Sequence, residues 1–370
     1  MGVENLQLGN DMRKFEKQKS KIAFYDKAVK LIFLSNGFSL ATILPHFPWI
    51  QRKLEIGDAL TGFALLFPAI GAVSMMLITG NLIQRYTSKR LILVGGILMQ
   101  FCIPLLLLAP SFTLLATFFF VFGGSTGMMD IAMNTQAARI ENIYQRPIMS
   151  SFHAVFSLGT LLGGGLTSLL LSLGWTPLEH AGMIAIILIL LIIACGPWLI
   201  SKEKPSVKKT PLVSFPRGPV LVLGLLAMMS MIAEGAAMDW SAIYARNLLE
   251  ASPSQSAAVF TVFAMTMTVG RFIGDRLVDH WGPKRMLNYS CSLGAIGLMI
   301  GIFSDRLEGA MFGFACLGLG LANSVPVLFS SASRIPGVNP GIGIAGVATL
   351  GYFGFLIGPP MIGTIAEFLG

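Results

Sequence analysis

The acidic residues Asp130, Glu234 and Asp239 of this 370-residue chain fall inside long apolar segments. An ionised side chain in the interior of a lipid bilayer costs about 3 kcal/mol unless it is paired or neutralised, so such residues are functional candidates. Glu234 lies near the middle of its segment and could take up a proton there, because an apolar setting disfavours the charged form of a carboxyl group. The alternative is a structural acid that is hydrogen-bonded to a neighbouring hydroxyl or amide.

Helical spacing predicts a second polar cluster. Asp130 and Asn134 are four residues apart and therefore share one face of a helix. His153, early in the next apolar segment, is expected at a similar depth to Asn134. An Asp–His pair could hold a proton near neutral pH and relay it. The alternative is a polar clamp between two adjacent helices.

A third set of candidates combines polar and aromatic residues. Asp239 and Trp240 are predicted near one end of their helix, where aromatic residues usually anchor the membrane interface. They could instead form a gate in which Trp240 stacks on a sugar-like ring. Asn36, in the middle of the first apolar segment, could hydrogen-bond a solute.

Membrane-crossing helices must position these candidates. Hydrophobic residues make up 54% of the chain and charged residues 12%, with a mean hydropathy of +0.73. Soluble domains carry about twice this share of charged residues, which excludes a water-soluble enzyme, a nucleic-acid-binding protein and a secreted disulfide scaffold. The apolar runs are about 20 residues long, enough to cross a hydrocarbon layer of roughly 30 Å. They predict spans at 28–50, 59–83, 89–109, 112–138, 148–172, 180–200, 218–246, 254–278, 284–304, 307–331 and 340–366.

The distribution of basic residues predicts the orientation of the chain. Of the 26 lysines and arginines, 22 fall in segments assigned to the side of the membrane that holds the N-terminus, and this set includes Arg271. Short cytoplasmic loops are enriched in lysine and arginine, so the N-terminus is predicted to be cytoplasmic. The net charge of +8 follows mostly from this bias, and no nucleic-acid partner is expected.

The two halves of the chain resemble each other at an offset of 195 residues. The segment 136–140 (QAARI) corresponds to 331–335 (SASRI), and Lys89–Arg90 corresponds to Lys284–Arg285. Such a repeat predicts two parallel six-helix halves. It also predicts a twelfth helix at about 375–395, beyond Gly370. The predicted parts are an N-terminal tail (1–27), a first half (28–200), a basic linker (201–217) and a second half (218–370).

Two loops carry a recognisable signature. The segment Gly80–Arg90 (GNLIQRYTSKR) resembles the loop between helices 2 and 3 of the major facilitator superfamily, and 274–285 (GDRLVDHWGPKR) resembles its second copy. Further stretches are similar to the YbjJ/MosC-type bacterial inner-membrane transporters of this superfamily: DIAMN at 130–134, SFH at 151–153, SLG at 157–159, EG at 234–235 and DWS at 239–241. The resemblance implies an all-helical polytopic membrane protein with two pseudo-symmetric six-helix halves.

The resemblance also implies gates. In the superfamily, the acid of this loop pairs with a basic residue at a nearby helix end, which here implies a latch between Asp279 and Arg334. In the first copy Gln84 replaces the acid and can only form a hydrogen bond without charge assistance, to Arg139 or to a helix N-terminus. An alternative role for the basic residues is topology signalling. The predicted gating residues are Gly80, Gln84, Arg85, Lys89, Arg90, Arg139, Gly274, Asp279, Gly282, Lys284, Arg285 and Arg334.

The function implied by the resemblance is secondary active transport of a small solute by alternating access in the bacterial inner membrane. It implies proton coupling through Glu234 and Asp130, and a sugar- or polyol-like substrate. The alternatives are a proton-driven exporter of drugs or metabolites, and a membrane receptor or scaffold without transport. The expected partners are the solute, protons and the lipid bilayer, with the protein as a monomer.

No enzymatic activity is expected from this sequence. It contains neither an ATP-binding loop nor a hydrolase motif. The four cysteines form no C-x-x-C pair, so we expect no metal site and no cofactor.

Overall fold

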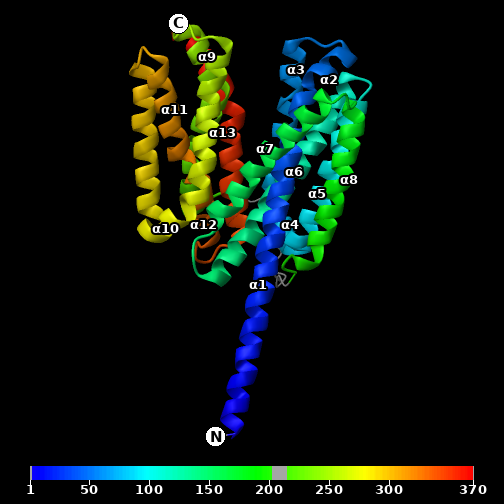
Figure 1. Ribbon diagram of the computed structural model, residues 1–370, viewed down its shortest axis with the longest axis vertical. Coiled ribbons are helices and arrows are strands. Elements are labelled where there is room, and N and C mark those ends of the chain that lie inside the picture. The colour runs from blue at the N-terminus through cyan, green and yellow to red at the C-terminus, as the bar shows by residue number, and fades with distance from the viewer. Residues whose placement is uncertain (1, 202–214, 370) are drawn as a thin grey trace.

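The computed structural model describes residues 2–201 and 215–369, and every regular element within these two ranges is helical (Figure 1). Within the same ranges, ten helices or broken helices are long and apolar enough to cross a membrane. The first half contains α1 (Gly2–Thr42), α2 (Phe47–Leu54), α3 (Asp58–Ala64), α4 (Leu66–Tyr86), α5 (Ser88–Leu108), α6 (Phe112–Tyr144), α7 (Met149–Ser172) and α8 (Pro177–Cys195). The second half contains α9 (Pro219–Leu248), α10 (Pro253–Phe303), α11 (Leu307–Leu321), α12 (Ser324–Ser333) and α13 (Pro340–Leu369).

Helix α10 accounts for two of the predicted spans. Its 51 residues would extend for about 75 Å if straight, more than twice the thickness of a hydrocarbon layer. The chain reverses at Gly282, whose φ of 75° and ψ of 162° lie outside the helical region, and Pro283 follows. Glycine adopts positive φ without strain, and proline starts the next helix without losing a backbone bond. The ten helices or broken helices therefore correspond to the eleven predicted spans, because α10 contains two of them.

Three boundaries differ from the sequence prediction. Helix α1 begins at Gly2, well before the predicted span at 28–50, because residues 2–27 include good helix formers and no proline. It ends at Thr42, before a short 3-10 turn over Leu44–His46, because Pro45 and Pro48 interrupt the helix. The predicted span 307–331 is broken between α11 and α12 at residues 322–323. Most of the predicted linker (202–214) lies outside the described residues.

The same kind of glycine packing recurs in both halves, as the repeat predicts. Gly159 of α7 lies directly against the backbone carbonyl of Leu34 on α1. Its counterpart, Gly354 of α13, lies against the backbone carbonyl of Met228 on α9. Small residues let two helix backbones approach this closely within a membrane. Each half therefore has a close helix crossing at the corresponding glycine.

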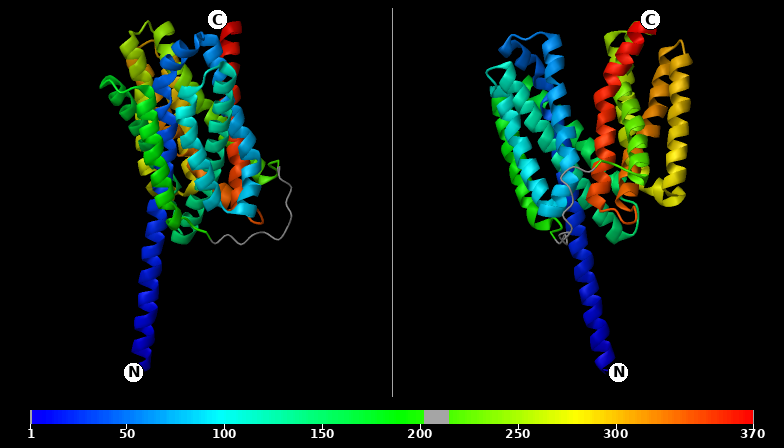
Figure 2. Two further views of the ribbon diagram at one scale, coloured as in Figure 1. Left: turned by 90° about the vertical axis from the view of Figure 1, so that its right-hand side faces the viewer. Right: turned by 180° about the vertical axis from the view of Figure 1, so that it is seen from behind.

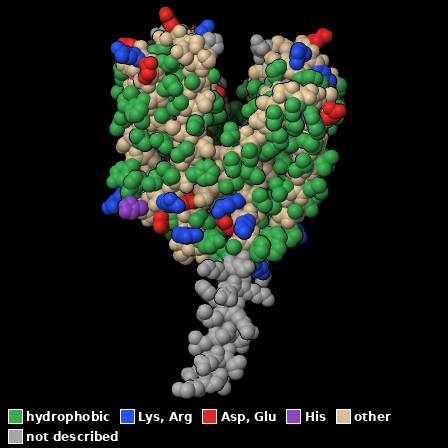
Figure 3. Space-filling model, in the orientation of Figure 1, with side chains coloured by type: hydrophobic (Ala, Val, Ile, Leu, Met, Phe, Trp, Pro, Cys, Tyr) green, Lys and Arg blue, Asp and Glu red, His purple; other side chains and the backbone are tan. Residues whose placement is uncertain are grey.

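The two halves meet at one face of the molecule and separate at the other. We call the face from which the start of α1 projects the N-terminal face; α13 ends at the opposite face (Figures 1 and 2). A cleft between the halves opens at that opposite face (Figure 3). Its floor lies where α4, α6 and α7 of the first half contact α10, α12 and α13 of the second half. The buried polar residues discussed below gather around this floor.

The second half has an apolar groove at a position that is filled in the first half. There, α8 packs on α5, with Ile192 against Gly96 and Gly196 near Leu93. In the second half, a cavity of about 610 Å³ lies between α9, the part of α10 after Gly282, α11 and α12. Cys291, the counterpart of Gly96, lines it.

Candidate functional site

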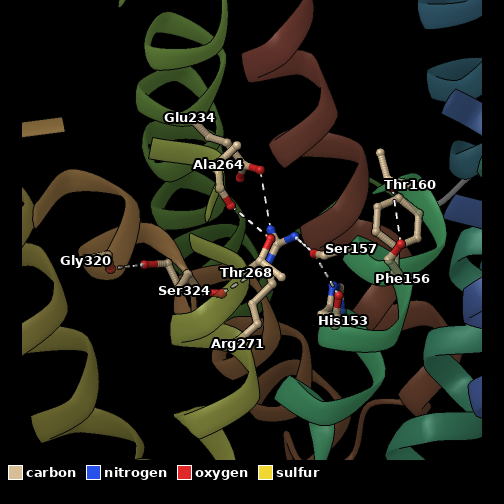
Figure 4. Close-up of polar contacts among 11 residues, drawn as sticks. His153, Phe156, Ser157, Thr160, Glu234, Ala264, Thr268, Arg271, Gly320 and Ser324 are labelled. Carbon is tan, nitrogen blue, oxygen red and sulfur yellow. Dashed lines mark hydrogen bonds and ion pairs between the residues drawn. The ribbon is translucent and has the colours of Figure 1, made fainter. Parts of the chain in front are cut away.

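Arg271 of α10 is the centre of a polar cluster at the cleft floor (Figure 4). Among the described residues it is the only lysine or arginine with a buried side chain. Its Nη1 donates to Ser157 Oγ on α7 at 2.7 Å, and its Nη2 lies 3.4 Å from Glu234 Oε1 on α9. Its Nε donates to the carbonyl oxygen of Ala322, where α11 ends, at 3.3 Å. One guanidinium group thus connects both halves of the molecule.

The two side-chain contacts of Arg271 differ in length. The bond to Ser157 has an ideal hydrogen-bond length, whereas 3.4 Å to Glu234 exceeds the usual range for a charge-assisted bond. Glu234 and Arg271 belong to the same half, but Ser157 belongs to the other half. In this conformation, the closer side-chain partner of Arg271 is therefore the one across the cleft floor.

A second polar group lies in the first half, between α6 and α7. Asn134 Nδ2 donates to Asp130, to Oδ1 at 3.2 Å and to the backbone oxygen at 2.9 Å. Asn134 Oδ1 lies 3.1 Å from His153 Nε2. Since an amide oxygen only accepts, His153 must carry a proton on Nε2. Asp130, Asn134 and His153 are all buried, so the structure brings these three predicted residues together.

Asp130 keeps one oxygen without a partner. Its Oδ2 is buried and has no hydrogen-bond partner among the described residues. The residue as a whole is only 6% exposed. An unpaired buried carboxylate oxygen is costly, so this group needs a proton, a water molecule or a ligand.

Ser157 links the two polar groups. Its hydroxyl group accepts from Arg271 and donates to the backbone oxygen of His153 at 3.1 Å (Figure 4). A continuous series of polar contacts therefore runs from Asp130 in the first half to Glu234 in the second half. The sequence candidates Glu234, Asp130 and His153 lie in this series, together with two residues that sequence reasoning missed, Arg271 and Ser157.

The N-terminal face is closed by a carboxylate on each half. Glu141, at the end of α6, accepts hydrogen bonds from the backbone N–H groups of Ile148 and Met149, both at 2.9 Å. Its other oxygen accepts from Arg334 Nη2 at 2.7 Å and from the Ser330 hydroxyl, both in the second half. The Glu141 side chain is almost completely buried. Because Glu141 and Arg334 belong to different halves, their ion pair exists only while the two halves are in contact here.

Asp275 of α10 makes the complementary contact. Its Oδ2 accepts from the backbone N–H of Ser151 at 3.1 Å and from the Ser151 hydroxyl, in the first turn of α7. Carboxylates at a helix N-terminus are stabilised by the free N–H groups and the helix dipole. The start of α7 is thus held by one acid from its own half, Glu141, and by one from the other half.

The structure corrects the predicted latch between Asp279 and Arg334. Arg334 pairs with Glu141 instead, and Asp279 is exposed at the N-terminal face. Gln84 Nε2 is buried without a partner among the described residues, and the expected contact of Gln84 with Arg139 or a helix N-terminus stays a prediction. Which acid pairs with Arg334 depends on distances that no spacing rule supplies.

The other gating candidates surround these contacts. Gly80 lies against Gly341 and Ala345 of α13, and Gly274 against Asn323 and Ser150. Gly282 forms the turn inside α10. Arg85, Arg90, Lys284 and Arg285 are exposed, while Lys89 and Arg139 are half-buried.

Three further candidates lie outside the polar cluster. Asn36 is buried inside the first half, where its Nδ2 faces Met99 Sδ of α5 at 3.9 Å, so it does not reach the cleft. Asp239 is exposed. Trp240 is half-buried, and its indole N–H has no partner among the described residues.

The missed residues had signals in the sequence. Arg271 and Asp275 both fall within the predicted span 254–278, yet Arg271 was counted among the cytoplasmic basic residues. A charged residue inside a predicted span is itself a signal of a functional site, and this applies to Arg271 as it does to Glu234. Glu141 lies three residues beyond its predicted span and gave no such signal.

Comparison with known proteins agrees with this architecture. The family model described as Major Facilitator Superfamily matches residues 31–359. An uncharacterized MFS-type transporter of Yersinia pestis is 35% identical over 340 residues, covering 92% of this chain and 88% of that protein. The membrane protein MosC of Rhizobium meliloti is 30% identical over 347 residues, covering 93% and 84%.

Solved structures show the same fold at low sequence identity. The transporter FucP in its outward conformation is 14% identical, with a TM-score of 0.71 over 94% of this chain and 92% of that chain. The human organic anion transporter MFSD10 is 16% identical, with a TM-score of 0.73 over 91% and 92%. From its sequence relatives, its fold and the match to the family model, this chain belongs to the major facilitator superfamily.

Proposed function

We propose that this protein is a proton-coupled secondary transporter that moves a small solute by alternating access in the bacterial inner membrane. It is a transporter of the major facilitator type by family and fold. The excess of basic residues on the N-terminal side favours a cytoplasmic N-terminal face. The cleft in Figure 3 would then open to the outside.

The observation that carries this proposal is the pair of buried acids at the cleft floor. Arg271 contacts both Glu234 and Ser157, which belongs to the other half. Asp130 has a buried oxygen without a partner among the described residues. Acids within membrane-spanning helices commonly bind protons or solute. Protonation of either acid changes the charge at the contact between the halves, which is the requirement for coupling a proton to a conformational change.

The contacts at the N-terminal face support a role as a gate. For the cleft to open on that face, Arg334 must leave Glu141 and Asp275 must leave the start of α7. These contacts are formed while the opposite face is open, as alternating access requires.

The substrate that we propose is a polar, sugar- or polyol-like solute. Hydroxyl, amide and guanidinium groups around the floor offer both donors and acceptors, as a polyhydroxylated solute needs. Two structural neighbours are described as a fucose:proton symporter and a proton:xylose symporter. They share only the fold with this chain, at 13% identity each.

The test uses purified full-length protein. Ligand binding to the folded state raises the melting temperature in a dose-dependent manner, so sugars, polyols, amino acids and cationic drugs would be screened at two pH values. Hits would then be tested for uptake into proteoliposomes with an imposed pH gradient. We expect uptake that is abolished by an uncoupler and by Glu234→Gln. Glu308→Gln, a change at an exposed acid at the start of α11, should leave uptake unchanged.

The alternatives predict different outcomes of the same assays. A proton-driven exporter of drugs would be stabilised by cationic compounds, and its transport would respond to the opposite pH gradient. A receptor or scaffold would bind a ligand without turnover. A facilitator without coupling would transport a solute with no response to the uncoupler.

A further inference from the structure

We infer that Ser157 is the positioning residue that converts the charge of Glu234 into opening or closing of the cleft, through a competition for Arg271. This inference rests on the proposed coupling role of Glu234 and adds the residue through which that role would act. Ser157 lies on α7 of the first half, whereas Arg271 and Glu234 lie on α10 and α9 of the second half.

The contact lengths define the competition. Arg271 lies 2.7 Å from Ser157 and 3.4 Å from Glu234, so the guanidinium group is placed toward the other half. An ionised carboxylate attracts a guanidinium group more strongly than a hydroxyl does, and such pairs usually lie at 2.7–2.9 Å. If Glu234 is ionised, Arg271 is drawn toward it and away from Ser157. If Glu234 is protonated, this attraction is lost and Arg271 stays with Ser157.

Only one of these contacts joins the halves. Glu234 and Arg271 move together within the second half, so their ion pair is compatible with either state of the cleft. The contact with Ser157 requires α7 and α10 to meet at the cleft floor, as they do here (Figure 4). Protonation of Glu234 therefore favours the conformation with a closed floor and an open cleft, and ionisation favours its opposite.

Other ionisable groups face this contact and must be separated from it. They are His153 on α7, Asp130 on α6 and Tyr352 on α13, and Asp275 follows Arg271 by one helical turn on α10. None of them contributes a side-chain hydrogen bond to Arg271 among the described residues. A variant at position 234 therefore isolates the contribution of Glu234 from theirs.

The experiment measures the width of the cleft without any substrate. Spin labels would be placed at the exposed positions Arg52 and Ser254, one on each half near the open face, after replacement of the four native cysteines. Pulsed electron paramagnetic resonance in lipid nanodiscs then gives the fraction of molecules with an open cleft between pH 5 and pH 8.

For the wild type, we expect the open fraction to rise as the pH falls. Glu234→Gln should hold it high at every pH. Ser157→Ala should lower the ratio of open to closed molecules by about 10-fold, the effect of losing one hydrogen bond to a charged group. In the double variant Glu234→Gln/Ser157→Ala, the effect of the position-234 change should largely disappear, because both changes act through Arg271.

Matched controls separate this role from a structural one. Ser157→Thr keeps the hydroxyl group and should behave as the wild type. Ser168→Ala removes another α7 serine that also donates to the backbone four residues earlier, so it should have no effect. Arg271→Lys keeps the charge but loses the planar fork, and should shift the ratio in the same direction as Ser157→Ala.

Three results would overturn the inference: an open fraction in Ser157→Ala equal to that of the wild type at every pH, a Ser157→Thr variant that behaves as Ser157→Ala, or a wild type that does not respond to pH. Because no solute is involved, these results do not depend on the transport assay. Absence of solute uptake alongside the expected pH response would contradict the proposed function and leave this inference intact.

Discussion

At the scale of single residues, buried charge is the feature that most distinguishes this chain. Asp130, Glu141, Glu234 and Arg271 all have mostly buried side chains, and each depends on a few polar partners. Removing one partner of a buried polar pair costs more than the pair contributes, because the remaining group loses its water without compensation. Neutral isosteres are therefore the informative substitutions.

Asp130→Asn should separate stability from transport. The amide keeps the shape of the carboxyl group and removes a charge whose Oδ2 has no partner among the described residues, so the melting temperature should stay the same or rise. Proton-driven uptake in proteoliposomes should fall by at least about 10-fold, since the site can no longer bind and release a proton. Uptake at the wild-type rate would show that Asp130 is a structural acid.

Glu141→Gln and Asp279→Asn should have unequal effects. Glu141 is buried and joins Arg334 of the other half, so its neutralisation should destabilise the protein by about 1–3 kcal/mol and lower its melting temperature. Asp279 is exposed, so its neutralisation should change stability by less than about 0.5 kcal/mol. The latch implied by the family resemblance requires the reverse order, which thermal unfolding of the two variants would reveal.

At the scale of helices, the packing of α7 on α1 depends on glycines with no room for a side chain. A Cβ at Gly159 would overlap the carbonyl group of Leu34, and one at Gly163 would overlap that of Phe38. The contact can therefore exist only where these residues stay small. Not every glycine of α7 has this role: the space around Gly165 is open.

Alanine substitutions along α7 should reflect this difference. Gly159→Ala should destabilise the protein by about 1–3 kcal/mol, because α1 and α7 would have to move apart. Gly165→Ala, on the same helix, should be neutral or stabilise by up to about 1 kcal/mol, because alanine favours the helix. The comparison requires only thermal unfolding of the two variants in the same detergent. Equal melting temperatures would exclude close packing at Gly159.

At the scale of the whole molecule, transport requires the two halves to separate at the N-terminal face. The start of α7 lies between them there and is bonded to Glu141 of its own half and to Asp275 of the other. A covalent link between α7 and α10 would hold two of the helices that join the halves together, so it should prevent the movement.

A disulfide between Ser151→Cys and Asp275→Cys should lock the cleft open. The two residues are in direct hydrogen-bond contact across the halves. Oxidation of the double variant should abolish uptake, and a reductant should restore it to the level of the reduced double variant. Comparing oxidised and reduced samples of the same protein removes the effect of losing Asp275 itself. Undiminished uptake after complete oxidation would show that these halves need not separate here.

The sequence by itself determined the fold class, the membrane spans and the internal repeat. These follow from local properties: runs of apolar residues long enough to cross a bilayer, and similar residues at a constant offset. The cluster of Asp130, Asn134 and His153 was also predictable, because the first two share a helix face and His153 lies near the start of the next helix.

Only the tertiary structure decided which charges meet. Arg334 pairs with Glu141, 193 positions away, and Arg271 meets Ser157, 114 positions away. Spacing along one helix fixes the face on which a residue lies, but not the face of another half that packs against it. That choice depends on how the two halves meet at the N-terminal face, which no local pattern encodes. Of the residues that connect the halves, the sequence analysis therefore missed Glu141, Ser157, Arg271 and Asp275, and it gave Arg334 a different partner.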